Sequence, residues 1–138
     1  MHEEKTILTS CTRLAEQDVR IDVLWLYGSR AKGTARPDSD YDFAVAFNHF
    51  PQNAWERRLQ SEMLALDWSD QLALPEDHLS VADINLAPLP LALNIVQKGR
   101  VLVVKNTLRL AREENRVTSM WEIDYQYSRK NYSRKKYG

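Results

Sequence analysis

The sequence is poor in several features, and each shortage excludes something. The chain of 138 residues has a single cysteine, Cys11, so an internal disulfide and a cysteine-based metal site are both excluded. No uninterrupted apolar run approaches the roughly 20 residues of a membrane-spanning helix. The N-terminal stretch MHEEKTILTS also lacks the apolar segment of a signal peptide. We therefore predict a cytoplasmic protein with no membrane contact.

An excess of either charge is also lacking. Lys+Arg and Asp+Glu number 19 each, so the whole-chain charge argues neither for nor against a nucleic-acid partner. The balance conceals a basic end, because residues 128–138, SRKNYSRKKYG, contain five Lys or Arg and no acid. We divide the chain into one domain over 1–127, long enough for a single core, and a basic, tyrosine-rich tail over 128–138.

Hydrophobic periodicity predicts helices and strands in alternation. Helices are expected over 3–19, 53–72, 88–97 and from 106 onward, with a short helical turn at 29–33. Strands are expected over 21–27, 41–47, 78–88 and 100–105. The inward face of the second long helix is expected to hold Trp55, Leu59, Met63, Leu66 and Trp68. This order predicts an α/β (α+β) domain, a small mixed sheet flanked by helices.

Two of only four glycines, Gly28 and Gly33, follow the apolar strand 21–27. A strand that ends in Gly28-Ser29 before a helical turn exposes backbone N–H groups and a hydroxyl, which favour a bound phosphate. Glycine allows the anion to approach the backbone closely. Arg30 is expected to add a phosphate contact. Because Gly-Ser pairs also begin many ordinary turns, this pattern by itself is weak.

The next strand begins with two aspartates, Asp40 and Asp42. A period of two places them on one side of the strand with Ala44, opposite Tyr41 and Phe43. Two such charges repel unless a cation lies between them, and Mg²⁺ prefers carboxylates together with phosphate oxygens. The alternative is a turn cap at Asp40 and a solvated Asp42. Together with the Gly-Ser turn, however, the pair favours phosphoryl or nucleotidyl transfer.

A third acid, Asp83, lies in the middle of the apolar strand pattern HLSVADINLAP. Burying an unpaired carboxylate would cost several kcal/mol. We therefore expect Asp83 at the same edge of the sheet, where it would complete a two-metal site or act as a base. The alternative is an ion pair with Arg36 or Arg100.

These residues carry a resemblance to a known family. Gly28-Ser29, ten residues and then Asp40-Tyr41-Asp42 resembles the Gly-Ser-x10-Asp-x-Asp signature of the nucleotidyltransferase superfamily that includes DNA polymerase β. The stretches YGSRAKGTARPDSDYDFAV, VADINLAP and IVQKGRVLVVK are similar to minimal nucleotidyltransferase (MNT) domains over about residues 20–105. The resemblance is greatest to MntA-type antitoxins, which are encoded beside HEPN-domain toxins. It implies the DNA polymerase β-like nucleotidyltransferase fold.

The resemblance also implies an activity. Such antitoxins are protein adenylyltransferases that move AMP from ATP to a tyrosine hydroxyl of the partner ribonuclease toxin, with two Mg²⁺ ions. Two alternatives stay open: a non-catalytic antitoxin that sequesters its toxin, and nucleotide transfer to a small molecule or an RNA. A domain this small has little room to bind its own acceptor, which favours a partner protein as the acceptor.

Site residues carry over from the family one by one. Gly28 and Ser29 would hold the triphosphate, and Asp40 and Asp42 the metals. Asp83 matches the family's third strand carboxylate, which would bind the catalytic metal and activate the attacking hydroxyl. Ser39 beside the metal pair and Arg30 at the phosphates are further candidates.

The basic tail allows three interpretations. Tyrosines interleaved with Lys and Arg over 125–137 can bind single-stranded nucleic acid by phosphate contacts and stacking. They can also dock on an acidic partner surface, or they can belong to a frayed, solvated terminus. We favour the partner surface over a weak RNA contact.

Overall fold

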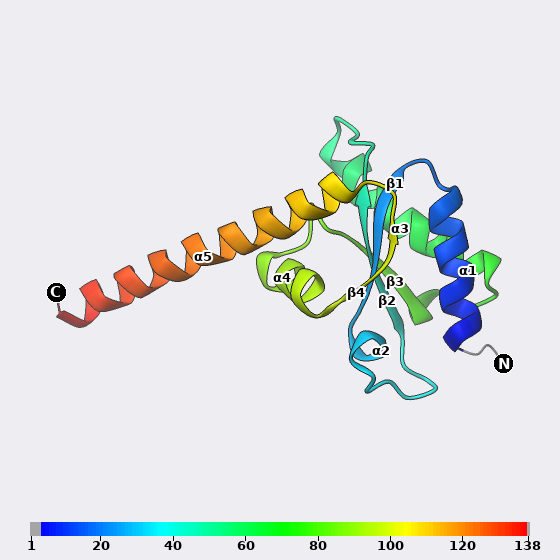
Figure 1. The fold of residues 1–138 in the computed structure, drawn as a ribbon, viewed down its shortest axis with the longest axis horizontal. Coiled ribbons are helices and arrows are strands. Elements are labelled where there is room, and N and C mark those ends of the chain that lie inside the picture. The colour runs from blue at the N-terminus through cyan, green and yellow to red at the C-terminus, as the bar shows by residue number, and fades with distance from the viewer. Residues whose placement is uncertain (1–3, 138) are drawn as a thin grey trace.

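The computed structural model describes residues 4–137, with side chains over 4–130. A four-stranded sheet in the order β3-β2-β1-β4 lies at its centre (Figure 1). Its strands are β1 (Ile21–Tyr27), β2 (Tyr41–Phe47), β3 (Leu79–Asp83) and β4 (Arg100–Val104). β1 pairs antiparallel with β2 and β4, whereas β2 and β3 are parallel. The predicted small mixed sheet is therefore confirmed.

Helices cover both faces of this sheet (Figure 1). α1 (Glu4–Gln17) and α3 (Ala54–Gln71) lie on one face, and α4 (Leu89–Lys98) with the first part of α5 (Thr107–Tyr137) lies on the other. The short α2 (Ser29–Lys32) follows β1, and a 3₁₀ turn, η1 (Glu76–His78), precedes β3. None of these helices, among residues 4–137, combines the length and the apolar character needed to cross a membrane.

The two cores follow from the alternation of side chains along β2. Phe43, Val45 and Phe47 are buried beneath α1 and α3. Ala44 and Ala46 face α4 and α5, and Trp25 of β1 pairs with Ala44. A small side chain such as Ala44 next to a large one such as Trp25 is a favourable cross-strand pair on one face of a sheet. The predicted division of strand 41–47 into two faces is confirmed.

The predicted inward face of α3 is wrong at Trp55, Met63 and Leu66, whereas Leu59 is half-buried and Trp68 is buried. Trp55, Met63 and Leu66 are exposed by 54%, 59% and 44%. The buried residues of this helix are Gln60, Ser61, Leu64, Trp68 and Ser69. α3 carries two apolar stripes. The stripe that contains Trp68 faces the sheet, because the Trp68 ring packs edge-on against Phe43 with ring centroids 5.7 Å apart.

β3 is shorter than the predicted strand 78–88. It ends at Asp83, whose carbonyl accepts hydrogen bonds from the Leu86 and Ala87 N–H groups at 3.0 and 2.9 Å. Asp83 is therefore the last residue of its strand, not a middle one. The turn that these bonds close begins the connection to α4.

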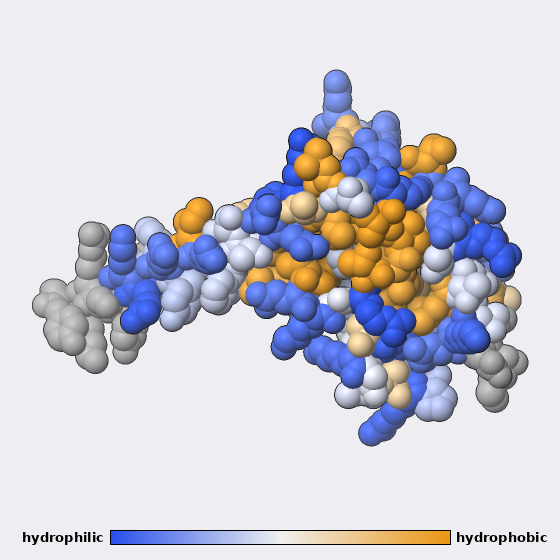
Figure 2. Space-filling view, viewed as in Figure 1, coloured by the Kyte–Doolittle hydropathy of each residue, from blue (hydrophilic) through white to orange (hydrophobic). Residues whose placement is uncertain are grey.

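α5 extends beyond the body of the domain (Figure 1). Its Val117 is fully buried, whereas no residue from 118 to 130 is. The backbone of residues 128–137 continues this helix. Figure 2 shows that the extension is largely hydrophilic, while hydrophobic side chains gather on the body over the edge strand β4, where Val101 and Val104 are exposed.

Candidate functional site

Gly28 forms the turn between β1 and α2. Its φ of 73° and ψ of −156° lie in a region of backbone space that essentially only glycine adopts. Its carbonyl accepts from the Ala31 and Lys32 N–H groups, each at 3.2 Å. Gly33, with φ 75° and ψ 17°, closes the same short helix in the left-handed conformation. The Gly-Ser turn is thus a tightly closed corner after a buried strand, in a conformation that requires glycine.

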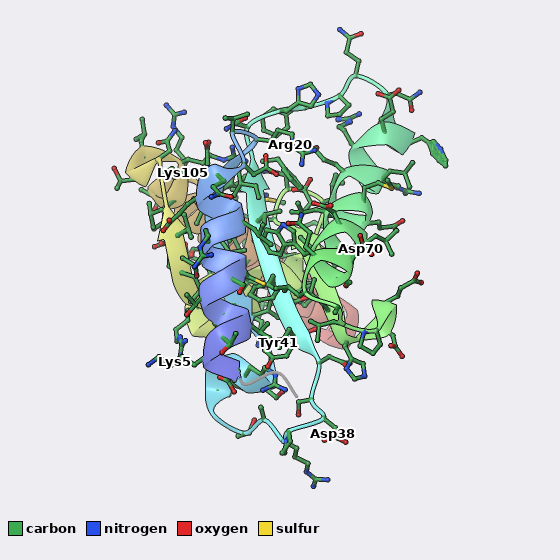
Figure 3. All side chains as sticks on the ribbon, turned by 90° about the vertical axis from the view of Figure 1, so that its right-hand side faces the viewer. Lys5, Arg20, Asp38, Tyr41, Asp70 and Lys105 are labelled. Atoms are coloured by element: carbon green, nitrogen blue, oxygen red, sulfur yellow. The ribbon has the colours of Figure 1, made fainter. Side chains whose placement is uncertain are left out.

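The two halves of the sequence motif meet at this corner. Tyr27 pairs with Asp42 across the sheet, which brings Gly28 directly against the Asp42 carboxylate. A Cβ added to Gly28 would lie only 2.5 Å from Asp42 Oδ2. Figure 3 shows Asp38, two residues before Asp40, and Tyr41, the residue after it, at the end of the sheet where α2 lies; Arg20 and Lys105 lie at the opposite end.

The Asp42 carboxylate is half-buried and electrostatically unfavourable as an anion. Burial raises the pKa of Asp42, the Ser80 hydroxyl opposes this by donating to Oδ1 at 2.9 Å, and the charge of the exposed Asp40 raises the pKa further. Burial and the charge of Asp42 also raise the pKa of Tyr27. A cation between the two aspartates would remove the repulsion.

The structure does not bring Asp83 to this corner. The parallel register pairs Asp42 with Ser80 and Val45 with Asp83. Asp83 is therefore three residues, roughly 10 Å, further along the sheet, and residues three apart on a strand point to opposite faces. The prediction that three acids meet at one edge is wrong. Among the described side chains no group of three His, Cys, Asp or Glu residues could hold a metal ion.

Asp83 has a local environment of its own. It is 8% exposed, and its Oδ1 accepts a hydrogen bond from the Asn85 N–H at 2.9 Å. Burial raises the pKa of Asp83, against the opposing effects of that hydrogen bond and of Arg109. The alternative ion pair with Arg36 or Arg100 is absent from the ion pairs of the described residues.

Asp83→Asn should leave nucleotide binding unchanged and alter the pH dependence of stability. Because the folded-state pKa is raised, wild-type stability declines as the pH rises from about 3.9, the ordinary unfolded value, through the folded pKa. The variant lacks this decline, so its advantage should grow from pH 4 to pH 7, to an amount on the order of 1 kcal/mol. Urea denaturation at both pH values measures it. A variant less stable than wild type at pH 7 would mean that attraction to Arg109 and Arg116 outweighs burial.

Arg30 and Ser39 hold the loop before β2 in place. Arg30 is buried, and its guanidinium lies over the Tyr41 ring, 3.9 Å from the ring centroid. It donates to the Ser39 carbonyl at 2.7 Å and to Glu4 Oε2 at 2.9 Å. The Ser39 hydroxyl accepts from the Arg36 N–H at 2.8 Å. Arg30 therefore anchors the loop that carries Asp40, and this is a different role from the phosphate contact that the sequence suggests.

The sequence interpretation missed two kinds of residue. Ser80 and Tyr27 flank Asp42, and no motif marks them, since Ser and Tyr are common in strands.

At the far end of the sheet, Arg109 donates to the Phe47 carbonyl at 2.8 Å and to Asn85 Oδ1 at 2.6 Å, and it pairs with the buried Glu113 at 2.8 Å. This second network fastens the start of α5 to the sheet and lies apart from the Gly-Ser corner.

Comparisons with known proteins agree with this geometry. The family model described as Polymerase beta, Nucleotidyltransferase matches residues 9–108. No curated protein matches the chain. Similar solved structures include a chain of a toxin–antitoxin complex with AMP-PNP, at TM-score 0.68 and 18% identity over 99% of this chain and 100% of that one.

Two further structures are similar to the same extent. A chain of the MntA-HepT toxin–antitoxin complex has TM-score 0.66 and 16% identity, over 98% of this chain and 100% of that one. A chain of the complex of a tri-AMPylated Shewanella oneidensis HEPN toxin with its MNT antitoxin has TM-score 0.67 and 16% identity, over 99% and 100%. At these identities the likeness is one of fold.

Proposed function

Because this chain belongs to the polymerase beta nucleotidyltransferase family, we propose that it is the antitoxin of a HEPN toxin and transfers AMP from ATP to a tyrosine hydroxyl of that toxin. The fold neighbours support the proposal: one includes AMP-PNP, and another includes a tri-AMPylated HEPN toxin.

One observation carries the proposal. The Gly28 turn and the Asp42 carboxylate are in direct contact, at a distance that leaves no room for a Cβ. A phosphate held at the turn would therefore lie beside the aspartate pair. In the transfer, the tyrosine hydroxyl loses its proton to solvent and its oxygen forms a bond to the α-phosphorus, while the bond from that phosphorus to the α–β bridging oxygen breaks and pyrophosphate leaves with the electron pair. Gly28 and Ser29 would bind the triphosphate and orient it for this attack.

The residues present fit one Mg²⁺ ion. Asp40 and Asp42 supply two carboxylates, which together with phosphate oxygens form the usual protein site for this ion. When bound, Mg²⁺ would neutralise the negative charge of the phosphates. A second ion requires further acidic ligands, and the described residues offer no third acid beside the pair.

The missing third acid favours a second candidate function. With Asp83 on the other face of the sheet, no third acid among the described residues joins Asp40 and Asp42 in a group that could hold a metal ion, and Asp83 cannot serve there as the base that activates the acceptor hydroxyl. In this second candidate the chain neutralises the toxin by covering it, and nucleotide binding serves the complex rather than a transfer.

Intact mass of the toxin separates the two candidates. We expect that incubating the product of the adjacent toxin gene with this chain, ATP and Mg²⁺ adds mass in steps of one AMP. Loss of ribonuclease activity without a change in mass would contradict transfer and support the second candidate. Omitting ATP is the matched control, because sequestration alone would still inhibit.

The extended part of α5 is proposed to contact the toxin. Met120, Trp121 and Ile123 are exposed on it by 47%, 40% and 69%, and the segment that follows is basic. In proteins most of the stability of a helix comes from packing of one of its faces against other residues. Apolar side chains beside a run of positive charge fit a partner groove with an acidic end.

Removing residues 128–138 should therefore weaken toxin binding about tenfold or more, the effect of losing roughly 1.4 kcal/mol. Titration calorimetry at two salt concentrations measures this, and the full chain should show the stronger salt dependence. Filter binding to single-stranded RNA is the comparison. Unchanged toxin affinity with loss of RNA retention would assign the segment to RNA instead.

A further inference from the structure

Ser80 occupies a defined position beside the aspartate pair. It faces Asp42 across the parallel β2–β3 register, on the same side of the sheet, and its hydroxyl donates to Asp42 Oδ1 at 2.9 Å. On the other side of Asp42 the register places Tyr27. The two cross-strand neighbours of Asp42 are thus a serine and a tyrosine, and neither is an acid.

We infer that Ser80 stands at the third-ligand position of a two-metal site, so that this chain takes one divalent cation with its nucleotide rather than two. Neighbouring strands lie about 4.8 Å apart, and paired catalytic metals are separated by about 3.5–4 Å. A carboxylate at position 80 would reach the space beside Asp42, where a second ion would be bound. The Ser80 hydroxyl is neutral and already donates to Asp42, so it adds no negative charge that would bind a second ion.

Packing does not force serine at this position. β3 is an edge strand, and Ser80 is exposed there. An aspartate would therefore meet solvent on one side and Asp42 on the other, without displacing core atoms. The choice of residue at position 80 controls the charge of the site, and it bears little on the stability of the sheet.

Manganese stoichiometry tests this inference. Wild type, Ser80→Asp and a matched control, Ser119→Asp, are titrated with Mn²⁺ in the presence of a non-hydrolysable ATP analogue, and bound Mn²⁺ is counted by electron paramagnetic resonance. Ser119 is exposed on α5, so its variant adds the same charge far from the corner. We expect one Mn²⁺ per chain in wild type and in Ser119→Asp.

The Ser80→Asp variant should bind a second Mn²⁺. Two ions at the separation of a two-metal site should also broaden each other's signal through spin coupling. Its affinity for the second ion should exceed that of wild type by roughly tenfold or more, so the ions are counted at a Mn²⁺ concentration that fills the second site only in the variant, because ligand charge count is a main determinant of such affinities. Circular dichroism tests whether the variant is folded, and the ion count of wild type does not depend on any variant. Two ions per wild-type chain, or a single ion in folded Ser80→Asp, would overturn the inference.

The inference about Ser80 rests on the proposed function because it assumes that the chain binds a nucleotide. The role of Ser80 and the proposed transfer of AMP can nevertheless fail separately. Two Mn²⁺ ions in wild type with AMP found on the toxin would overturn the role of Ser80 and leave the proposed transfer standing. One ion in wild type and two in Ser80→Asp, with no AMP on the toxin from either protein, would support the role of Ser80 and contradict the transfer.

Discussion

Gly28→Ala is expected to lower nucleotide affinity by a factor of ten or more and to destabilise the fold. The backbone of Gly28 lies where a Cβ costs about 1–3 kcal/mol. The added methyl group would also lie 2.5 Å from Asp42 Oδ2 and 3.3 Å from its Cγ, so the carboxylate has to move. Fluorescence titration with a labelled ATP analogue measures the affinity, and urea denaturation measures the stability.

Gly33→Ala is the matched control for this change. Gly33 also has a positive φ, +75°, but a Cβ there would meet nothing within 4 Å. Both variants carry backbone strain, and only Gly28→Ala disturbs Asp42. Equal losses of nucleotide affinity in the two variants would mean that strain in α2, rather than contact with the carboxylate, controls binding.

Asp40→Asn and Asp42→Asn are expected to reduce AMP transfer by about a thousandfold each while leaving toxin binding intact. Each change removes a negative charge that would hold the cation, and such electrostatic contributions are commonly several kcal/mol at the transition state. The rate of mass gain by the toxin measures the effect. Asp38→Asn, two residues before Asp40 in the exposed loop, is the matched control and should transfer AMP at the wild-type rate.

Stability should respond to Asp42→Asn in the opposite direction from activity. Burial and the Asp40 charge raise the pKa of Asp42 in the folded state. Its ionised form therefore opposes folding once the pH exceeds the unfolded value of about 3.9. At pH 7 the amide should leave the fold as stable as wild type or more so, as is common where function requires strain. Transfer retained by Asp42→Asn would contradict the proposed chemistry, and a variant that unfolds would assign Asp42 a structural role.

Local sequence was sufficient for the elements that position the site. The apolar runs of 21–27 and 41–47 coincide with β1 and β2, because alternation and β-branched or aromatic residues are local signals of a buried strand. The Gly-Ser turn and the aspartate pair could be found for a similar reason. Each depends on backbone freedom or on side-chain charge over a few neighbouring residues.

Contacts between distant segments decided the rest. The sequence predicted Asp83 as the neighbour of Asp42, and only the β2–β3 register shows that Ser80 holds this place instead, since a shift along a strand changes both position and face. The rotation of α3 depends on the fit of Trp68 against Phe43, and the burial of Arg30 on its bonds to Ser39 and Glu4. The sequence by itself determined which elements form and which residues carry charge. The tertiary structure decided which of those charges meet, because pairing register and helix rotation are set by packing between residues far apart in the chain.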